Sequence, residues 1–353
     1  MLCAVSVIAA SVGVTGCAST GPRVSRQEIE EARQALDLKA LQFQFRQTLR
    51  VNSVGYRLVR HLPPGEAEER APYIGLLLTP MSAQTAQLYR LPSDLRGVVV
   101  VGAVPESPAA RAGLAEGDVI LAVDGRMVKQ PKTVLEILAR TTADRQVAWT
   151  IWREGRDVVV ALQPERLPFR VAFLMVDEQE INASAHQGRR VFVTYGLLRF
   201  VESDDELAVI LGHELAHHTR HHLPKEFGTS ILTSMVGFTA AVGTEILVPG
   251  AGVAVLRGVK GAFDATFSQD FEREADDIGL RYAHRAGYDV EAGRRVWERF
   301  AVEMPRSMTR HLFSTHPTSP ERLVHMEKSA AALKGTPDDT PALTAAMQPG
   351  ASR

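Results

Sequence analysis

His213-Glu214-Leu215-Ala216-His217 is the stretch that decides the fold of the catalytic part of this chain. On a helix, residues four apart share a face, with Cβ atoms roughly 5–6 Å apart, so both imidazoles can bind one zinc ion. Glu214 is the candidate general base, which takes a proton from zinc-activated water and hands it to the leaving amine. The preceding segment, 204–212, begins with acidic residues and becomes apolar, which predicts that the motif lies on a buried helix.

Composition limits the classes of protein that the chain can represent. Its 353 residues allow two or three domains, and a hydrophobic content of 45% is enough to build their cores. The formal net charge is −1, from 40 basic and 41 acidic residues. This balance argues against electrostatic binding of nucleic acid. Both cysteines, Cys3 and Cys17, lie near the N-terminus, so the remaining chain can form no internal disulfide.

The first residues are typical of an export signal. Residues 2–14 are almost wholly apolar or small, and too short to span a bilayer of about 30 Å. The segment ends in Val14-Thr15-Gly16-Cys17, which resembles a bacterial lipobox. We therefore expect residues 1–16 to be a lipoprotein signal peptide and Cys17 to carry the lipid, which anchors the protein in the periplasm at the outer membrane. The alternative is an ordinary signal peptide with an incidental cysteine.

Changes in composition and in hydrophobic pattern divide the mature chain into blocks. The pattern of residues 24–62 predicts a helix. We expect residues 17–45 to form an N-terminal tether and helix, and 46–69 to form the first helix of the peptidase domain. Short β-rich runs follow in residues 70–164. Residues 165–330 are mostly helical after an opening pair of strands, and the composition of 331–353 predicts disorder. The expected fold class is α+β, with a mainly helical zincin domain of gluzincin type, a small edge-strand sheet and an inserted β-rich domain.

The β-rich block resembles a PDZ domain. Tyr73-Ile74-Gly75-Leu76 matches the loop whose backbone N–H groups receive the terminal carboxylate of a peptide, and residues 131–141 would be the helix beside the groove. The resemblance implies that a peptide C-terminus adds as a strand to the exposed sheet edge. The alternative is a domain of PDZ shape that only packs on its neighbour.

The apolar stretch from Ile231 to Leu256 is long enough to span a membrane. Glu245, Pro249 and several glycines interrupt it. We expect two shorter buried or membrane-facing helices rather than one transmembrane helix.

A zinc hydrolase needs a third protein ligand, and an acidic segment supplies candidates. In the predicted helix 268–286, Glu272 and Asp276 share a face, whereas Glu274 points elsewhere. The chain here resembles the BepA/HtpX-like zinc metalloproteases, the family that includes the CAAX prenyl proteases. The resemblance implies that Glu272 is the third zinc ligand and Asp276 orients a ligand histidine; Glu274 is the competing ligand.

Further matches extend this likeness. In this family the segment after Asn182-Ala183, which includes Val191, Phe192 and Val193, forms the edge strand along which the substrate lies. Ser314-Thr315-His316-Pro317, with Arg322 behind it, matches a late motif whose His316 either binds zinc or assists catalysis. His221 is expected to support the metal site, whereas His218 and His222 are expected to be solvated or packing residues.

The function implied by these features is that of an envelope zinc endopeptidase with one zinc ion per chain. Its expected substrates are misfolded or assembling envelope proteins, with the PDZ domain recognising peptide C-termini or exposed segments. One alternative is a chaperone or scaffold that keeps the fold but barely cuts. Another is an integral membrane protease, which requires residues 231–256 to span the bilayer.

Overall fold

A computed structural model describes residues 22, 24–63, 71–223, 255–256, 267–303 and 319–334. Two compact units are separated along the chain, residues 1–40 and 41–353, and helix α1 (Arg26–Arg60) runs through both. Within the second unit, one face of α1 is buried through Phe45, Thr48, Val51, Val54 and Leu58. This spacing by three or four residues is the apolar stripe that a helix presents to a core.

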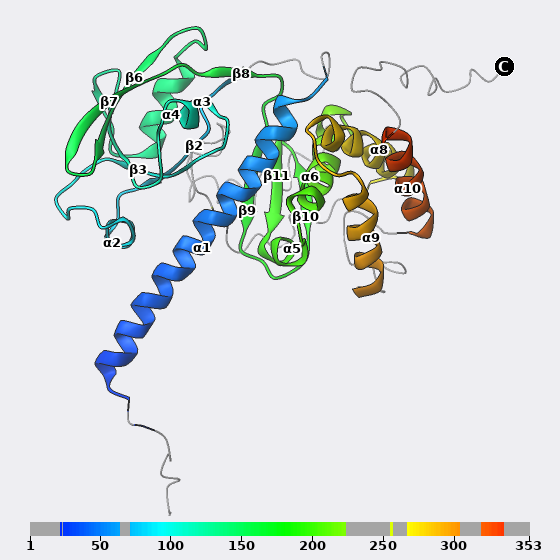
Figure 1. Cartoon of the computed structure of the whole chain (residues 1–353), viewed down its shortest axis with the longest axis horizontal. Helices are drawn as coiled ribbons and strands as arrows, with labels where there is room; N and C mark the ends of the chain where they lie inside the picture. Colours follow the sequence, from blue (N-terminus) through cyan, green and yellow to red (C-terminus); the bar gives the residue numbers. More distant parts are fainter. Residues whose placement is uncertain are drawn as a thin grey trace, which may run out of the picture. The chain divides into compact units, whose positions relative to one another are not determined.

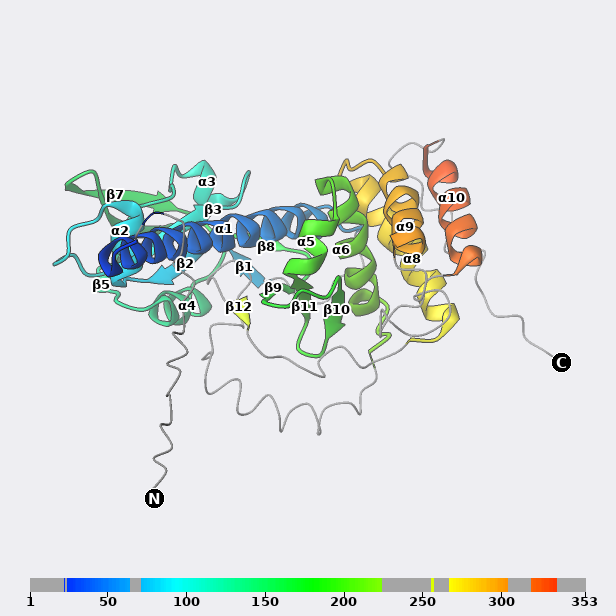
Figure 2. The ribbon, with the colours of Figure 1, turned by 90° about the horizontal axis from the view of Figure 1, so that it is seen from below.

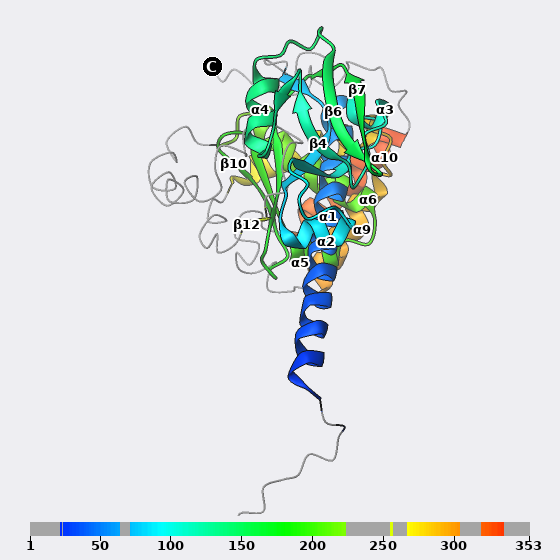
Figure 3. The same ribbon diagram turned by 90° about the vertical axis from the view of Figure 1, so that its left-hand side faces the viewer.

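The β-rich block consists of an antiparallel sheet with short helices around it (Figure 1). The strands follow the order β2-β3-β4-β6-β7, with β5 paired to β4. Figure 3 shows α4 beside the strands β4 and β6. The elements are β2 (Leu76–Pro80), α2 (Ala83–Tyr89), β3 (Val98–Ala103), α3 (Pro108–Arg111), β4 (Val119–Val123), β5 (Arg126–Met127), α4 (Pro131–Ala139), β6 (Val147–Arg153) and β7 (Arg156–Leu162).

Helix α2 was not anticipated from the sequence. Ser82 begins it with a reciprocal cap, in which the Ser82 hydroxyl accepts from the Thr85 N–H and the Thr85 hydroxyl accepts from the Ser82 N–H. Arg90 ends it in the left-handed conformation, with φ 54°. The helix therefore lies between β2 and β3, at the end of β2 that is far from the Tyr73–Leu76 loop.

The peptidase block combines a small mixed sheet with helices (Figures 1 and 2). The sheet order is β10-β11-β9-β12, and α6 packs against β10 and β11, with α8, α9 and α10 gathered beyond it. The elements are β9 (Ala172–Val176), β10 (Ala183–His186), β11 (Arg190–Thr194), α5 (Tyr195–Phe200), α6 (Asp204–Thr219), β12 (Val255–Leu256), α8 (Gln269–Arg285), α9 (Glu291–Glu303) and α10 (Pro320–Lys334).

Two expectations about this block need correction. The expected opening strand pair belongs to a four-stranded sheet, because β9 and β12 join β10 and β11. Val255 and Leu256, expected at the end of a helix, form β12 and pair in parallel with Met175 and Val176 of β9. Short apolar runs suit a buried strand as well as a helix, and here pairing with the sheet decides between them.

Helices α6 and α8 approach each other closely because two glycines meet where they cross. A Cβ added to Gly212 would lie 2.6 Å from the Gly279 carbonyl oxygen, and one added to Gly279 would lie 2.5 Å from the His213 nitrogen. No side chain fits between these backbones. The two glycines therefore let α8 lie directly against the part of α6 that carries the histidines.

Helix α1 also joins the two blocks of the second unit. Phe45 packs with Leu77 and Val101 of the β-rich block. Eleven residues further along, the Tyr56 ring stacks on Tyr73 at 4.9 Å and the Tyr56 hydroxyl donates to Glu165 at 2.6 Å. The Tyr56 and Tyr73 side chains belong to the hydrophobic core of the peptidase block, so the two blocks share buried contacts along one helix.

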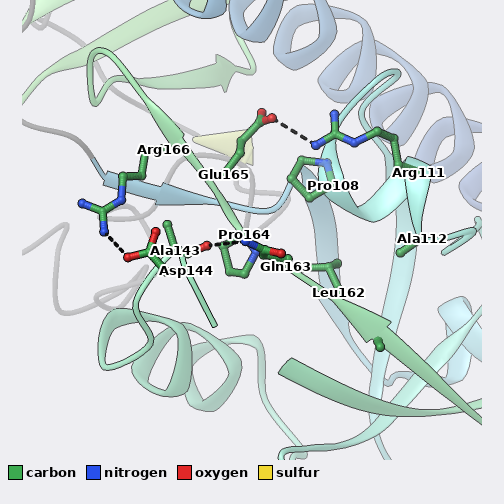
Figure 4. A pocket seen from close by; sticks show the side chains of 11 residues that line it. Pro108, Arg111, Ala112, Ala143, Asp144, Leu162, Gln163, Pro164, Glu165 and Arg166 are labelled. Carbon is green, nitrogen blue, oxygen red and sulfur yellow. Dashed lines mark hydrogen bonds and ion pairs between the residues drawn. The ribbon is translucent and has the colours of Figure 1, made fainter. Parts of the chain in front are cut away.

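The strand that leads into the β-rich block pairs with the strand that leads out of it. Strand β1 (Ala71–Tyr73) pairs antiparallel with β8 (Glu165–Leu167), with Tyr73 opposite Glu165. A cavity of about 540 Å³ lies beside β8, and Figure 4 shows ion pairs between Arg111 and Glu165, and between Arg166 and Asp144, around it. Their N–O distances are 3.2 Å and 2.8 Å. Both ion pairs connect β8 to the β-rich block.

Several predictions fall on residues outside the described ranges. These are the signal peptide with Cys17, the loop with His316, most of 231–256 and nearly all of the 331–353 tail, although α10 continues to Lys334. Among the described residues, no helix is long and apolar enough to cross a membrane.

Candidate metal centre

Three buried side chains from α6 and α8 converge on one point. The Nε2 atoms of His213 and His217 lie 3.1 Å apart. The two carboxylate oxygens of Glu272 lie 3.5 Å from His213 Nε2 and 3.6 Å from His217 Nε2. Each side chain offers one ligand atom, and these atoms lie within 4.8 Å of one another. A set of two imidazoles and one carboxylate leaves an open position on a four-coordinate zinc ion, as hydrolytic zinc sites require.

The charge of the cluster fits a divalent cation. Glu214, Glu272 and Asp276 each expose only 1% of their surface, and Arg322 is the buried cation packed against them. Three carboxylates and one guanidinium leave a net charge of about −2, which is costly to bury without compensation. One zinc ion would balance it. Both the types of ligand atom and the net charge of the cluster are therefore suited to a zinc ion.

Asp276 and Arg322 form the second layer of the site. Asp276 Oδ1 lies 2.9 Å from His213 Nδ1, while Arg322 donates to both Asp276 oxygens at 2.8 and 2.7 Å and reaches Glu272 at 2.9 Å. Burial raises the pKa of Asp276, but the charge and hydrogen bonds of Arg322 and the bond from His213 outweigh it and hold this pKa well below its usual range. An ionised Asp276 favours the His213 tautomer with its proton on Nδ1, so that the Nε2 lone pair faces His217 and Glu272.

His217, the second candidate ligand, is contacted by His222, a residue expected to be solvated or to pack. His222 is buried, and its Nδ1 lies 3.1 Å from His217 Nδ1, while its Nε2 lies 3.3 Å from Glu274. His221, expected in this supporting role, is exposed. The physical reason is that α6 ends at Thr219 and His221 adopts φ 56°, so the helical spacing of four does not continue. Glu274, the competing ligand, therefore contacts His222 rather than the ligand cluster.

Glu214 lies on α6 between the two histidines and is almost fully buried. The negative charge of Glu214 affects the pKa of two neighbouring histidines. Burial lowers the pKa of His186 to about 4 and that of His218 to about 4, and the charge of Glu214 opposes both shifts. His186 ends strand β10, so the candidate base lies beside that strand.

The structure contradicts the predicted edge strand. Val191, Phe192 and Val193 lie in β11, an inner strand that pairs with β10 on one side and β9 on the other. All three are fully buried. Among the described strands, β10 occupies the edge, because the chain turns back at Gly188 and places Ala183–His186 outside β11. Strand order depends on this turn, which the apolar pattern of β11 does not reveal.

The residues of the expected carboxylate loop connect β1 to β2. Ile74 and Gly75 accept backbone hydrogen bonds from Ala109 and Val104. Gly75 has φ +76°, and a Cβ there would lie 2.2 Å from the Ser107 Cβ. Glycine is therefore required by both backbone conformation and space. Strand β2 is an edge of its sheet among the described strands, which leaves its outer side available to an added strand.

Comparison with known proteins agrees with this geometry. Residues 149–330, just over half of the chain, match the profile of peptidase family M48, and residues 99–153 match that of the PDZ domain. The chain belongs to peptidase family M48, a family of zinc metalloproteases. The predicted family, the α+β fold class and the zinc cofactor are thereby confirmed.

Individual relatives share only parts of the chain. A beta-barrel assembly-enhancing protease of Yersinia pestis is 30% identical over 52% of this chain and 39% of its own length. The mitochondrial metalloendopeptidase OMA1 of Bos taurus is 30% identical over 44% of this chain and 31% of its own. The chain thus spans well under half the length of these relatives. A solved HtrA-type protease, AlgW with a decapeptide, aligns with 28% of this chain and 30% of its own, at 26% identity and a TM-score of 0.27.

Proposed function

We propose that this protein is a zinc endopeptidase that cleaves misfolded or assembling proteins of the bacterial envelope. The observation that carries the proposal is the buried cluster of His213, His217 and Glu272, whose donor types and charge suit zinc. Zinc held there would polarise the scissile carbonyl and acidify a water molecule. We assign the roles of ligands to these three residues.

The surrounding residues have separate tasks in this proposal. Glu214 accepts the proton of the attacking water and later donates it to the leaving amine. Asp276 and His222 each hold the Nδ1 side of one ligand histidine, so that both Nε2 atoms point at the metal position. Arg322 keeps Asp276 ionised and holds the carboxylates of Asp276 and Glu272 in place.

The substrate backbone is assigned to the outer edge of β10. This strand packs against α6 and ends at His186, whose pKa responds to the charge of Glu214. An extended substrate that pairs with β10 would therefore lie beside the base and gain main-chain hydrogen bonds without regard to its sequence. Such binding suits an enzyme that cuts unfolded segments.

The remaining parts of the proposal concern recognition and location. The PDZ domain binds substrate or partner C-termini through the Tyr73–Leu76 loop and the edge of β2. The lipid on Cys17 anchors the protein at the outer membrane, facing the periplasm. The name of the beta-barrel assembly-enhancing relatives supports an envelope role.

A protease assay with a matched pair of variants tests the enzyme assignment. Purified protein is incubated with unfolded casein, with and without a zinc chelator, beside Glu214→Gln and Glu178→Gln. We expect chelation and Glu214→Gln to abolish cleavage, with zinc retained in Glu214→Gln because only the base is lost. Glu178 is a half-buried loop residue outside the metal cluster, and Glu178→Gln should cleave normally. Equal, chelator-insensitive activity in all samples would refute the enzyme, and protection of an outer-membrane protein from aggregation without cleavage would favour the chaperone instead.

A further inference from the structure

A second cavity, of about 830 Å³, lies at the end of the PDZ sheet that is far from the Tyr73–Leu76 loop. Met81, at the end of β2, and Gln130, at the start of α4, both line it. Its walls combine apolar side chains such as Leu91 with three exposed cations, Arg90, Arg96 and Lys129. Neither the metal site nor its substrate strand uses this cavity.

The direction of a bound peptide determines which part of it would meet the cavity. A peptide whose carboxylate occupies the loop before Leu76 runs antiparallel to β2. Its upstream residues therefore proceed from Leu76 toward Pro80. Strand β2 has five residues, which a paired strand covers with about five of its own at roughly 3.4 Å each. Residues about six to eight positions from the C-terminus would then enter the space beside Met81.

The positive charge of the cavity determines which side chains of the peptide would bind there. Of the described residues that line it, none is an aspartate or a glutamate. Arg96 donates from one terminal nitrogen to the carbonyl oxygens of Ser93 and Leu95. These bonds hold the guanidinium near the loop, and within the described part of the chain its positive charge has no carboxylate partner. The backbone N–H of Arg90 donates to the carbonyl oxygens of Ala86 and Gln87, which fixes the backbone of Arg90 at the end of α2.

We propose that this cavity is a subsite for an acidic segment that lies about six to eight residues upstream of a peptide C-terminus bound to the PDZ domain. The inference rests on the proposed peptide binding and adds the chemistry of the preferred ligand. The carboxylates of the segment would approach Arg90, Arg96 and Lys129, while its apolar atoms contact Met81 and Leu91. Substrates with acidic tails would bind more tightly than those with neutral ones.

The test measures the binding of fluorescent ten-residue peptides to the full chain by polarisation. All peptides end in the same apolar residues and a free carboxylate, and they carry aspartate, serine or lysine at the three upstream positions. We expect the acidic peptide to bind about five- to tenfold more tightly than the neutral one at low salt, with the difference shrinking as salt rises.

Charge reversal provides the control. Arg96→Glu combined with Lys129→Glu should abolish or invert the preference, measured as the ratio of the affinities of the acidic and the neutral peptide for the same variant. Arg156→Glu, which reverses an exposed cation at the start of β7, should keep the preference. Equal affinity for acidic and neutral peptides would refute the subsite but leave PDZ binding intact. Absence of binding by every peptide would refute both.

Discussion

Replacing Gly279 with alanine should disturb zinc binding although residue 279 supplies no ligand atom. The new Cβ would lie 2.5 Å from the His213 nitrogen and 2.8 Å from the Gly212 carbonyl carbon. Ordinary contacts begin near 3.4 Å, so α6 and α8 must separate by about 0.9 Å. A functional site tolerates displacements of only about 0.5 Å. Since Glu272 and Asp276 lie on the same rigid helix as Gly279, their distances to His213 must lengthen.

We expect Gly279→Ala to weaken zinc affinity at least tenfold, measured by competition with a chromophoric chelator. The same contact should lower the free energy of unfolding by about 1–3 kcal/mol, despite a gain in helix propensity of about 1 kcal/mol. Gly293→Ala in α9 is the matched control, because its Cβ would meet only side-chain atoms of Leu280, Met326 and Val209 at 3.1–3.2 Å. Wild-type zinc affinity in Gly279→Ala would show that the helix crossing does not set the ligand distances.

Three further predictions concern single side chains. Glu272→Ala should lose bound zinc by elemental analysis, whereas full occupancy would refute its assignment as a ligand. His222→Ala should weaken zinc binding by about 10- to 100-fold, and His222→Asn should restore part of it, because the asparagine amide oxygen can take the place of His222 Nδ1 and accept from His217 Nδ1; equal loss in both would argue for a packing role. His186 has a pKa lowered to about 4 by burial, so the unfolded chain takes up its proton first as the pH falls. The free energy of unfolding should therefore fall by roughly 3 kcal/mol between about pH 6.5 and 4 because of His186. His186→Gln should flatten this pH dependence in chemical unfolding experiments. The pH dependence that is left in the variant should come from His218.

Local patterns predicted the helices of the metal site well. The acidic start and apolar run before His213 correspond to α6, and the spacing of Glu272 and Asp276 corresponds to their shared face on α8. These features depend on helical geometry, which a single sequence reveals. The roles of the side chains remain proposals, but the structure brings His213, His217 and Glu272 together.

Features that depend on chain turns and tertiary contacts were missed. His221 follows the helical spacing from His217, but the helix ends first, and His222 takes the buried position. The apolar run of β11 looks the same for an inner strand as for an edge strand. The pairing of Gly212 with Gly279 joins positions far apart in sequence, and only the packed helices show why both lack a side chain.

The antiparallel pairing of β1 with β8 has a consequence for how such a chain can arise. Strands that run side by side in opposite directions leave the ends of the enclosed segment as neighbours. A whole folded domain can then be inserted into a surface turn, or removed from it, by a change in the gene. Because the two ends of the domain are close together, closing the turn costs the surrounding protein little conformational entropy. The same peptidase body could therefore exchange one recognition module for another during evolution, and a shortened protein with a brief linker in its place should still assemble its metal centre.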